Sequence, residues 1–409
     1  MGQHSDHSPP LLALAVALSL GAAVSLGITR FAYGLLLPPM RADLNWSYTL
    51  AGAMNTANAA GYLLGALATP ALMRRLGPST LLVVGAFLAS AFMGLSGFFT
   101  EAAPLLLQRV LAGVASAFLF IAGGLLAARM GAMQPSRSGF LLGIYYGGTG
   151  VGIVLSAVLV PAVLDAAQAR THGWAWAWWL LALACFVGSA LLIWPARALA
   201  RIESNARDNA AARPSSHVRF SWRAFAPSLV GYTMFGVGYI GYMTFVIALL
   251  REQGVGASRI TLFYALLGVA VMASSRIWAG LLDRYKGGQA LAILNALLGV
   301  ATILPAVTSA WPLVLASGLV FGGVFLSVVA STTALVRHNL APSQWAAGIS
   351  AFTIVFAAGQ IVGPTIVGWI ADGPGGLSRG LVFSACALWV GAALAWRQRP
   401  LQPAAIPVT

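Results

Sequence analysis

Residues 11–39 read LLALAVALSLGAAVSLGITRFAYGLLLPP, and the one charged side chain in this apolar run is Arg30. A membrane-spanning helix needs about 20 apolar residues, so the run is long enough to cross a bilayer. A cleaved signal peptide is shorter and begins with basic residues. Here no Lys or Arg precedes Arg30. The run is therefore predicted to remain as the first spanning helix.

The same apolar character extends along all 409 residues, of which 59% are hydrophobic and 8% charged. Globular proteins carry about a quarter charged residues, so this composition excludes a soluble domain. Twelve helices of about 20 residues fit the length, with short loops and one longer linker. The 46 Gly and 13 Trp agree, because Gly is common in spanning helices and Trp collects at the bilayer surfaces.

Further apolar stretches, bounded by charges, Pro or Gly clusters, follow the first one. Spans are predicted at 11–39, 48–73, 78–99, 103–130, 138–164, 174–195, 224–250, 259–281, 289–308, 312–336, 345–371 and 379–396. Between the sixth and seventh lies a polar stretch rich in Ala, Asn, Ser and Arg, which is typical of a flexible linker. The sequence thus predicts an all-α membrane protein with an amino-terminal six-helix bundle (1–195), a cytoplasmic linker (196–223) and a carboxy-terminal six-helix bundle (224–409).

The net charge of +14 indicates topology and not nucleic-acid binding, because the basic residues are scattered through loops and do not cluster on a soluble face. Most of the 23 Lys and Arg residues lie on the side of both termini. The opposite loops hold only Arg41, Arg170, Arg251, Arg259 and Arg379. The positive-inside rule then predicts a multi-pass membrane protein with both termini and the linker in the cytoplasm.

The residue types in the spans also exclude several chemistries. Cys185 and Cys386 both lie in apolar runs, so neither a disulfide framework nor a metal site is predicted. Gly236, Gly238 and Gly241 spell G-x-G-x-x-G, but within an apolar span and not at a strand-to-helix turn, so no dinucleotide site is expected. The spans show no catalytic set of carboxylates, His or Ser, so an enzyme and a cofactor are not expected.

One loop in each half carries a motif. In the second half Arg276, Gly280, Asp283 and Arg284 spell R-x-x-x-G-x-x-D-R, which resembles the signature between helices eight and nine of the major facilitator superfamily. The first half holds a degraded copy around Arg74 and Arg75, in which Thr69 stands where the family usually has an acidic residue. The resemblance implies that Asp283, Arg284, Arg74 and Arg75 belong to a gating motif. The missing acid puts in doubt a latch in the first half.

Two more patterns carry the resemblance. Arg109, Gly113 and Ala117 resemble a fourth-helix motif of the superfamily, and G-x-x-R-F-x-Y at 27–33 resembles a sparsely characterised bacterial branch. The resemblance covers essentially the whole chain. It implies two pseudo-symmetric bundles that rock about a central site, a functional monomer and no covalent chemistry.

Three arginines, Arg30, Arg109 and Arg276, lie inside spans, whereas all nine acidic residues lie in tails, loops or span ends. A buried arginine costs at least a few kcal/mol unless it has a partner or a wet cavity. An anionic ligand relieves this imbalance, because guanidinium binds carboxylate or phosphate oxygens with two hydrogen bonds. We therefore expect Arg30 and Arg276 to face each other across the cleft and to hold an anion. The alternatives are that Arg276 only supports the loop motif, and that backbone carbonyls satisfy Arg109.

Polar side chains at helical spacing suggest the rest of the cavity lining. Each of them could equally form an interhelical hydrogen bond. The predicted substrate contacts besides the arginines are Tyr33, Asn55, Asn58, Tyr62, Tyr145, Tyr239, Tyr242 and Gln360.

The predicted function is secondary active transport of a small organic anion, most simply a mono- or dicarboxylate. No interior carboxylate or His is available to carry a proton, so a proton would travel on the substrate, or a counter-anion would be exchanged. The alternative is an exporter of amphipathic drugs or metabolites. A sensor that has lost transport is a third possibility, which the intact second-half motif disfavours.

Overall fold

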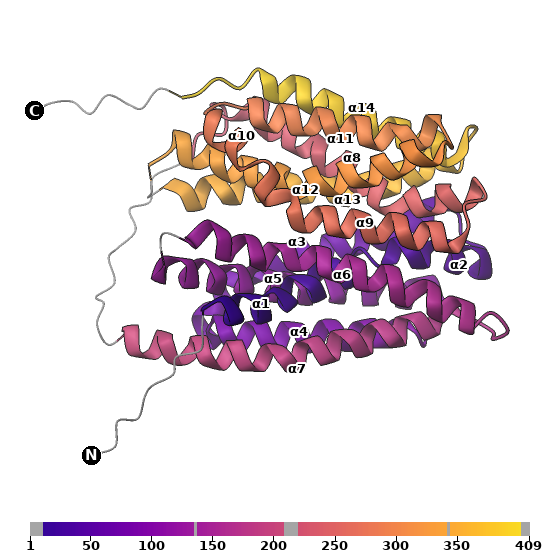
Figure 1. Ribbon diagram of the computed structural model, residues 1–409, viewed down its shortest axis with the longest axis horizontal. Helices are drawn as coiled ribbons and strands as arrows, with labels where there is room; N and C mark the ends of the chain where they lie inside the picture. Colours follow the sequence, from indigo (N-terminus) through magenta and orange to yellow (C-terminus); the bar gives the residue numbers. More distant parts are fainter. Residues whose placement is uncertain (1–10, 135–136, 208–219, 342–343, 402–409) are drawn as a thin grey trace, which may run out of the picture.

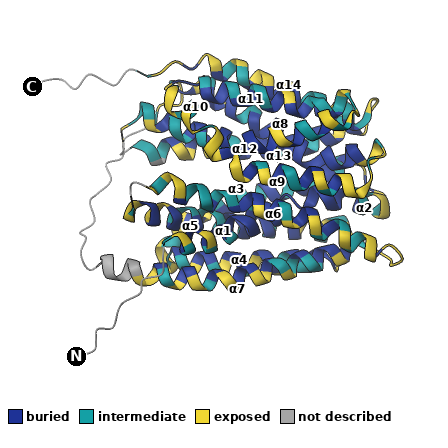
Figure 2. Cartoon of the chain, in the orientation of Figure 1, coloured by how far each residue is buried: buried dark blue, intermediate teal, exposed yellow. Residues whose placement is uncertain are grey.

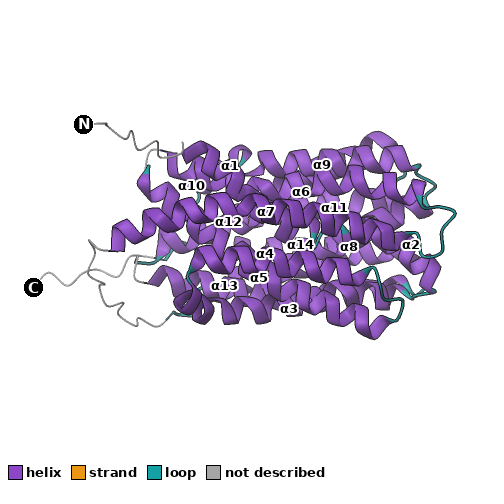
Figure 3. Cartoon of the chain, turned by 90° about the horizontal axis from the view of Figure 1, so that it is seen from below, coloured by secondary structure: helices purple, strands orange, loops and turns teal. Residues whose placement is uncertain are grey.

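The computed structural model describes residues 11–134, 137–207, 220–341 and 344–401, and within these ranges the regular structure is helical throughout (Figures 1 and 3). The first span consists of α1 (Leu11–Ala22), the π-helix η1 (Ala23–Ile28) and α2 (Tyr33–Leu44). The amino-terminal half continues with α3 (Tyr48–Leu76), α4 (Pro78–Ser96), α5 (Ala102–Met133), α6 (Ser138–Ala166) and α7 (Trp174–Arg207). The carboxy-terminal half comprises α8 (Ala226–Glu252), α9 (Ala257–Ile277), α10 (Ala279–Arg284), α11 (Gln289–Val307), α12 (Trp311–Asn339), α13 (Trp345–Ala371) and α14 (Gly376–Trp396).

The twelve predicted spans correspond to these helices, with α1, η1 and α2 forming one span and α9 and α10 another. Among the described residues, 11 helical segments are long and apolar enough to cross a membrane. The remaining span is α3, which has 29 residues but carries Asn55, Thr56 and Asn58, whose side chains lower its mean hydropathy. Hydropathy alone would therefore miss the helix that contributes most polar groups to the interface between the bundles.

The two halves form two layers with nearly parallel helix axes, the indigo-to-magenta half below and the orange-to-yellow half above (Figure 1). Buried residues concentrate inside each layer and between the layers, and exposed residues lie on the outer faces (Figure 2). We call the side on which α1 begins and α14 ends the terminal side, and the opposite side the distal side.

The boundary of the linker differs from the prediction. Helix α7 runs on to Arg207, so residues 196–207 continue the sixth span as helix and do not begin a flexible linker. Residues 208–219 lie outside the described residues, and 220–223 lead into α8. The Ala- and Arg-rich composition of 196–207 is compatible with helix, and the prediction gave too much weight to its polarity.

The first span is interrupted near its middle. The amide of Thr29 donates to Val24 O and that of Phe31 donates to Leu26 O, both five residues back, which is the π-helical pattern. Gly27 allows the close packing of this segment, because a Cβ there would lie 2.7 Å from the Cα of Gly152 on α6. Residues 29–32 then turn before α2 begins at Tyr33. The break disturbs the backbone hydrogen bonding of the helix, although Phe31 O still accepts a hydrogen bond from the amide of Gly34 at 3.2 Å. In a membrane interior, other groups are needed to bind carbonyls that a helix no longer satisfies.

The bundles touch mainly through α2 with α8, α3 with α13, and α6 with α9. On the distal half of α3, Thr56 Oγ1 donates to Ile361 O on α13 at 2.7 Å. Toward the terminal side the same stripes of both helices are uncovered, since Leu67 on α3 is 62% exposed and Ile354 on α13 is 43% exposed. Helices α3 and α13 are therefore in contact on the distal half and exposed toward the terminal side, whereas α6 and α9 stay in contact there, with Arg276 over the Phe140 ring.

A carboxylate of one bundle caps a helix of the other at the distal end. Asp372, directly after α13, accepts hydrogen bonds from the backbone amides of Tyr48 at 2.7 Å and Thr49 at 2.9 Å. These amides belong to the first turn of α3, where N–H groups lack helical partners and the helix dipole favours an anion. Tyr48 also donates its hydroxyl to Glu252 of α8. We call these contacts the distal latch.

The latch is expected to persist at neutral pH. Burial alone would raise the pKa of Asp372, but the Thr49 and Tyr48 hydrogen bonds and nearby Arg41 outweigh it and hold this pKa below the ordinary value. A lowered pKa means that the ionised carboxylate stabilises the latched state at all pH values above the ordinary range. The stabilisation is lost only as the pH falls through the ordinary carboxylate range, near pH 4, and below it.

Removing the charge of Asp372 should loosen the distal side. In the variant Asp372→Asn we expect a cysteine placed at Thr56, in a Cys386→Ser background, to react about fivefold faster with a maleimide, because a lost helix cap costs about 1 kcal/mol. The matched control is Asp165→Asn, since Asp165 also lies at a distal helix end but bonds to Gln168 of its own bundle. Equal labelling rates in the two variants would show that Asp372 does not hold the bundles together.

Candidate functional site

Arg30 lies in the break of the first span, at the interface between the bundles. Its side chain is 3% exposed, and Nη2 donates a hydrogen bond to Oε1 of Gln360 on α13. The guanidinium carbon lies 5.9 Å from the centroid of the Tyr62 ring on α3. A buried cation of the amino-terminal bundle is thus bound to an amide of the other bundle.

The positive charge of Arg30 is not balanced by the groups around it. Among the described residues its contacts are an amide and an aromatic ring, and neither is a carboxylate. Its Nε is buried and has no hydrogen-bond partner. An uncompensated buried charge is costly, and an unpaired donor adds to that cost.

Arg109 on α5 has the opposite environment. Nη1 donates to the carbonyl of Thr29 at 2.8 Å and Nη2 donates to Asn55 Oδ1 at 3.0 Å. Nε reaches Met54 O at 3.4 Å, and the guanidinium lies over the Tyr33 ring at 5.1 Å. Every nitrogen of the Arg109 side chain therefore has a partner within its own bundle. The interpretation that groups of its own bundle satisfy Arg109 agrees with these contacts, and a substrate contact of Arg109 stays a prediction.

Several residues predicted to line the cavity support this arrangement instead. Tyr33 donates its hydroxyl to Ala51 O at 2.8 Å, and Asn58 donates to the carbonyl of Arg109 at 3.2 Å. Asn55 binds Arg109 through its oxygen and donates through Nδ2 to Thr244 Oγ1 of α8 at 2.7 Å. Asn55, Asn58 and Tyr62 therefore do not act together. The two amides bind backbone or neighbouring helices, and Tyr62 lies beside Arg30.

Arg276 does not face Arg30, contrary to the expected clamp. Tyr264 on α9 donates to the carbonyl of Phe31 at 2.7 Å, which fixes the level of α9 relative to the break. Arg276 lies twelve residues further toward the terminal side, about 18 Å along the helix at 1.5 Å per residue. Its side chain is exposed, and its guanidinium carbon lies 4.9 Å from the centroid of the Phe140 ring on α6. The predicted span 259–281 corresponds to α9 and α10, so its boundaries are not at fault. Arg30 and Arg276 lie at different depths within these spans, and the expected clamp ignored that difference.

The remaining predicted contacts are aromatic and lie in both bundles. Tyr239 is 2% exposed and close enough to Arg30 to interact with it electrostatically. Tyr242 lies further along α8 and exchanges a hydrogen bond with Ser317 at 2.7 Å. Tyr145 donates to Phe120 O at 2.8 Å, so its hydroxyl is used inside the amino-terminal bundle. Tyr62, Tyr239 and Gln360 thus surround Arg30, and we call these four residues the central site.

The proposed gating residues lie at the terminal side. Asp283, Arg284, Arg74 and Arg75 are all exposed. Helix α9 ends before Trp278, whose indole nitrogen donates to Gly323 O at 2.8 Å, and the motif continues in the short helix α10. Lys286 binds the backbone carbonyl of Asp283 at 2.9 Å. The role of these residues in gating stays a prediction.

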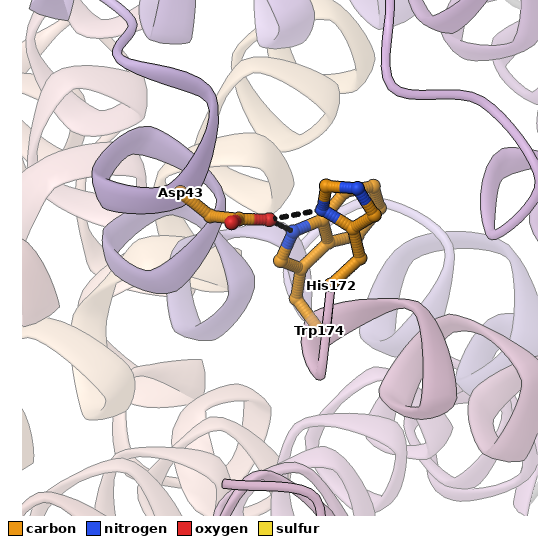
Figure 4. A network of polar contacts seen from close by, with 3 residues as sticks. All are labelled: Asp43, His172 and Trp174. Carbon is orange, nitrogen blue, oxygen red and sulfur yellow. Dashed lines mark hydrogen bonds and ion pairs between the residues drawn. The ribbon is translucent and has the colours of Figure 1, made fainter. Parts of the chain in front are cut away.

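The distal end of α2 is also fixed. Asp43 Oδ2 lies 2.6 Å from His172 Nδ1 and accepts a hydrogen bond from Trp174 Nε1 at 2.5 Å (Figure 4). Both partners lie at the loop between α6 and α7, so this contact stays within the amino-terminal bundle. It holds the helix that follows the break and contributes no group to the central site.

Comparison with known proteins identifies the kind of molecule. Residues 22–396 match the model of a family described as uncharacterised MFS-type transporter YbfB, where MFS is the major facilitator superfamily. The chain belongs to this family. A chloramphenicol resistance protein from Streptomyces lividans is 27% identical over 388 residues, which cover 93% of this transporter and 95% of the relative.

Two solved structures show the same fold. The nucleoside transporter NupG is 13% identical, with a TM-score of 0.68 over 94% of this transporter and 98% of NupG. A bacterial homolog of the human lysosomal transporter Spinster, in an inward-facing and unoccupied conformation, is 16% identical, with a TM-score of 0.64 over 95% and 97% of the two chains. The family and these structures are transporters and not enzymes, which confirms the superfamily resemblance and the all-α fold.

The sequence interpretation missed two residues that shape the transporter's interface. Tyr264 holds α9 against the broken first span. It could have been found from the sequence, because it is a polar aromatic residue within an apolar run, like the other interior tyrosines. Asp372 was noted only as an acidic residue at a span end, and no sequence pattern reveals that it caps α3. Within the described ranges, no three His, Cys, Asp or Glu side chains gather so as to hold a metal ion.

The two buried arginines should respond differently to substitution. Arg109→Gln leaves the carbonyls of Thr29 and Met54 without their donor. We expect the thermal unfolding midpoint of the purified transporter to fall by about 5 °C or more, since breaking such a buried network costs about 3 kcal/mol. Arg30→Gln removes an uncompensated charge, so its midpoint should stay within about 2 °C of the wild type. Tryptophan fluorescence on heating measures both, and an equal loss in the two variants would contradict the division of roles.

Proposed function

We propose that this transporter moves a small organic anion of single negative charge by alternating access, with the anion bound at Arg30. The observation that carries the proposal is the buried Arg30 guanidinium, which has an unpartnered Nε and no carboxylate among its described contacts. A carboxylate would accept a hydrogen bond from this Nε and neutralise the charge. The substrate is then the missing counter-ion of the site.

The positions of the other cations indicate that the substrate carries a single negative charge. Arg109 uses its donors on Thr29, Met54 and Asn55 and has none to offer. Arg276 lies about 18 Å away along α9. A second carboxylate on the substrate would find no cation in the central site and would pay a desolvation cost. We therefore favour a monocarboxylate over the dicarboxylate that a pair of arginines would have bound.

The central site also couples binding to the movement of the bundles. Arg30 and Tyr62 belong to the amino-terminal bundle, and Gln360 and Tyr239 belong to the other. A substrate that contacts both sets is bound most tightly when the bundles close on it, so it shifts the population toward an occluded state. Release on either side then requires the bundles to part.

The direction of opening depends on the membrane topology. We place the terminal side in the cytoplasm, because most basic loop residues lie there. The distal latch then closes the outer side of the bacterial inner membrane, and the uncovered stripes of α3 and α13 open toward the cytoplasm. The transporter would act as a monomer, with a proton carried on the substrate or with a counter-anion in exchange.

A second function is favoured by one relative. The Streptomyces lividans protein is named for chloramphenicol resistance, and an MFS protein with that role would export the drug. Export of amphipathic drugs or metabolites would use the aromatic side chains of the interface and would not need Arg30. The two functions therefore differ in their dependence on this residue.

A ligand panel separates the two functions. We expect monocarboxylates to raise the thermal unfolding midpoint of the wild type, dicarboxylates to do so no better, and sugars and cationic drugs to have no effect. Arg30→Gln should reduce the affinity for the monocarboxylate at least tenfold, because a charged hydrogen bond contributes about 1.5–3 kcal/mol.

The control is Arg276→Gln, which removes a spanning-helix arginine outside the central site and should bind the monocarboxylate like the wild type. Stabilisation by chloramphenicol that is equal in the wild type and in Arg30→Gln, with no effect of any carboxylate, would favour the exporter and refute the anion carrier.

A further inference from the structure

Four aromatic rings of the carboxy-terminal bundle form a parallel stack next to the central site. Phe356 on α13 stacks on Tyr232, Phe235 and Tyr239 of α8, with ring centroids 4.9, 5.3 and 5.5 Å apart and interplanar angles of 22°, 8° and 21°. The three α8 rings are buried, whereas Phe356 keeps part of its surface accessible. We call these four residues the α8–α13 stack.

The amino-terminal bundle presents a second group of rings. Tyr146 on α6 packs against Phe120 of α5 at 5.5 Å and against Tyr145 at 5.2 Å. Tyr62 on α3 lies near Tyr146 and within 5.9 Å of the Arg30 guanidinium carbon. Tyr62 and Tyr146 are only partly buried, so each offers surface to a ligand.

The two groups of rings approach each other at Arg30. The Tyr62 ring lies 5.9 Å from the guanidinium carbon of Arg30. Tyr239 of the stack packs on Phe325 at 5.9 Å, and Phe325 packs against Phe31, the residue after Arg30, at 5.8 Å. The Arg30 bond to Gln360 places the cation four residues along α13 from Phe356, which is one helical turn. The unpartnered donor of Arg30 therefore lies between accessible rings that belong to both bundles.

We infer that the transported anion is an aromatic monocarboxylate, with its carboxylate on Arg30 and its ring packed between Tyr62 and Tyr146 on one side and Phe356 on the other. This inference rests on the proposed function, because the carboxylate occupies the same cation. It adds a requirement on the rest of the substrate. A flat ring packs on aromatic faces in offset or edge-to-face geometry, and such a pair adds about 0.5–1.5 kcal/mol beyond the burial of its area.

An aromatic substrate also suits the movement of the transporter. Because the accessible rings lie in opposite bundles, a flat ring between them is contacted on both sides only when the bundles close. Short aliphatic acids reach Arg30 but leave the accessible surface of Phe356 without a ligand contact. The side chains that favour closure of the bundles are then the same ones that distinguish aromatic from aliphatic substrates.

Matched ligands test the inference on the purified full-length transporter. Benzoate and cyclohexanecarboxylate carry the same charge and the same number of carbon atoms, but only benzoate is flat and aromatic, and benzamide is its neutral counterpart. We expect benzoate to bind about three- to tenfold more tightly than cyclohexanecarboxylate, measured by calorimetry, and benzamide to show no binding.

The variants assign this preference to the rings. Phe356→Leu should bring benzoate to within twofold of cyclohexanecarboxylate and leave the affinity for cyclohexanecarboxylate unchanged. If Phe356→Leu fails to fold, Tyr146→Leu tests the opposite ring group with the same expected result. The control is Phe87→Leu, because Phe87 is also partly buried but pairs with Phe186 away from the central site, and it should keep the full preference.

The outcomes separate the inference from the function on which it rests. Equal binding of benzoate and cyclohexanecarboxylate, both lost in Arg30→Gln, would leave the anion carrier standing and overturn the aromatic substrate. Binding of neither acid would overturn both. A preference for benzoate that survives in both Phe356→Leu and Tyr146→Leu would show that these rings do not recognise the substrate.

Discussion

The hydrogen bond from Arg109 to the carbonyl of Thr29 holds the interrupted first span in place, and the centre of the molecule depends on it. The π-helical turn and the residues that follow it expose carbonyls in a region where no water is available to bind them. Arg109 binds the one at Thr29, and Tyr264 of the other bundle binds the one at Phe31. A continuous helix would need neither partner, but it would also place Arg30 differently relative to the interface.

The two buried arginines therefore have complementary tasks. Arg109 uses every side-chain nitrogen on the amino-terminal bundle, and this fixes the backbone from which Arg30 projects. Arg30 uses Nη2 on Gln360 of the other bundle and keeps Nε unpartnered. The charge of Arg109 is satisfied within its own bundle, and the charge of Arg30 is the one that we propose binds the substrate. The distal latch holds the same interface together at the distal end.

The spans could be predicted closely from the sequence, because their apolar residues must face lipid or packed helices whatever the details of the fold. The span of α3 was also predicted despite Asn55 and Asn58, because charged residues flank it on both sides. The functional interpretation fared less well for physical reasons. The partners of Arg109 are mainly backbone carbonyls, which no residue pattern encodes. The clamp of Arg30 with Arg276 required both side chains to lie at one depth, whereas their positions within correctly predicted spans place them at different depths. The prediction that Arg30, Tyr62, Tyr239 and Gln360 lie in the interior depended only on burial and helical spacing, and the structure brings these four together.

The most direct test of this account is the Nε–H resonance of Arg30 in transporter labelled with ¹⁵N-arginine, identified by its loss in Arg30→Lys. An unpartnered buried N–H that gains a carboxylate acceptor should shift on titration with benzoate, whereas the Nε–H of Arg109, which already reaches Met54 O, should not move. A shift of Arg109 with no change at Arg30 would contradict the assignment of the two arginines. No shift at either residue, in a sample that calorimetry shows to bind benzoate, would place the anion elsewhere in the molecule.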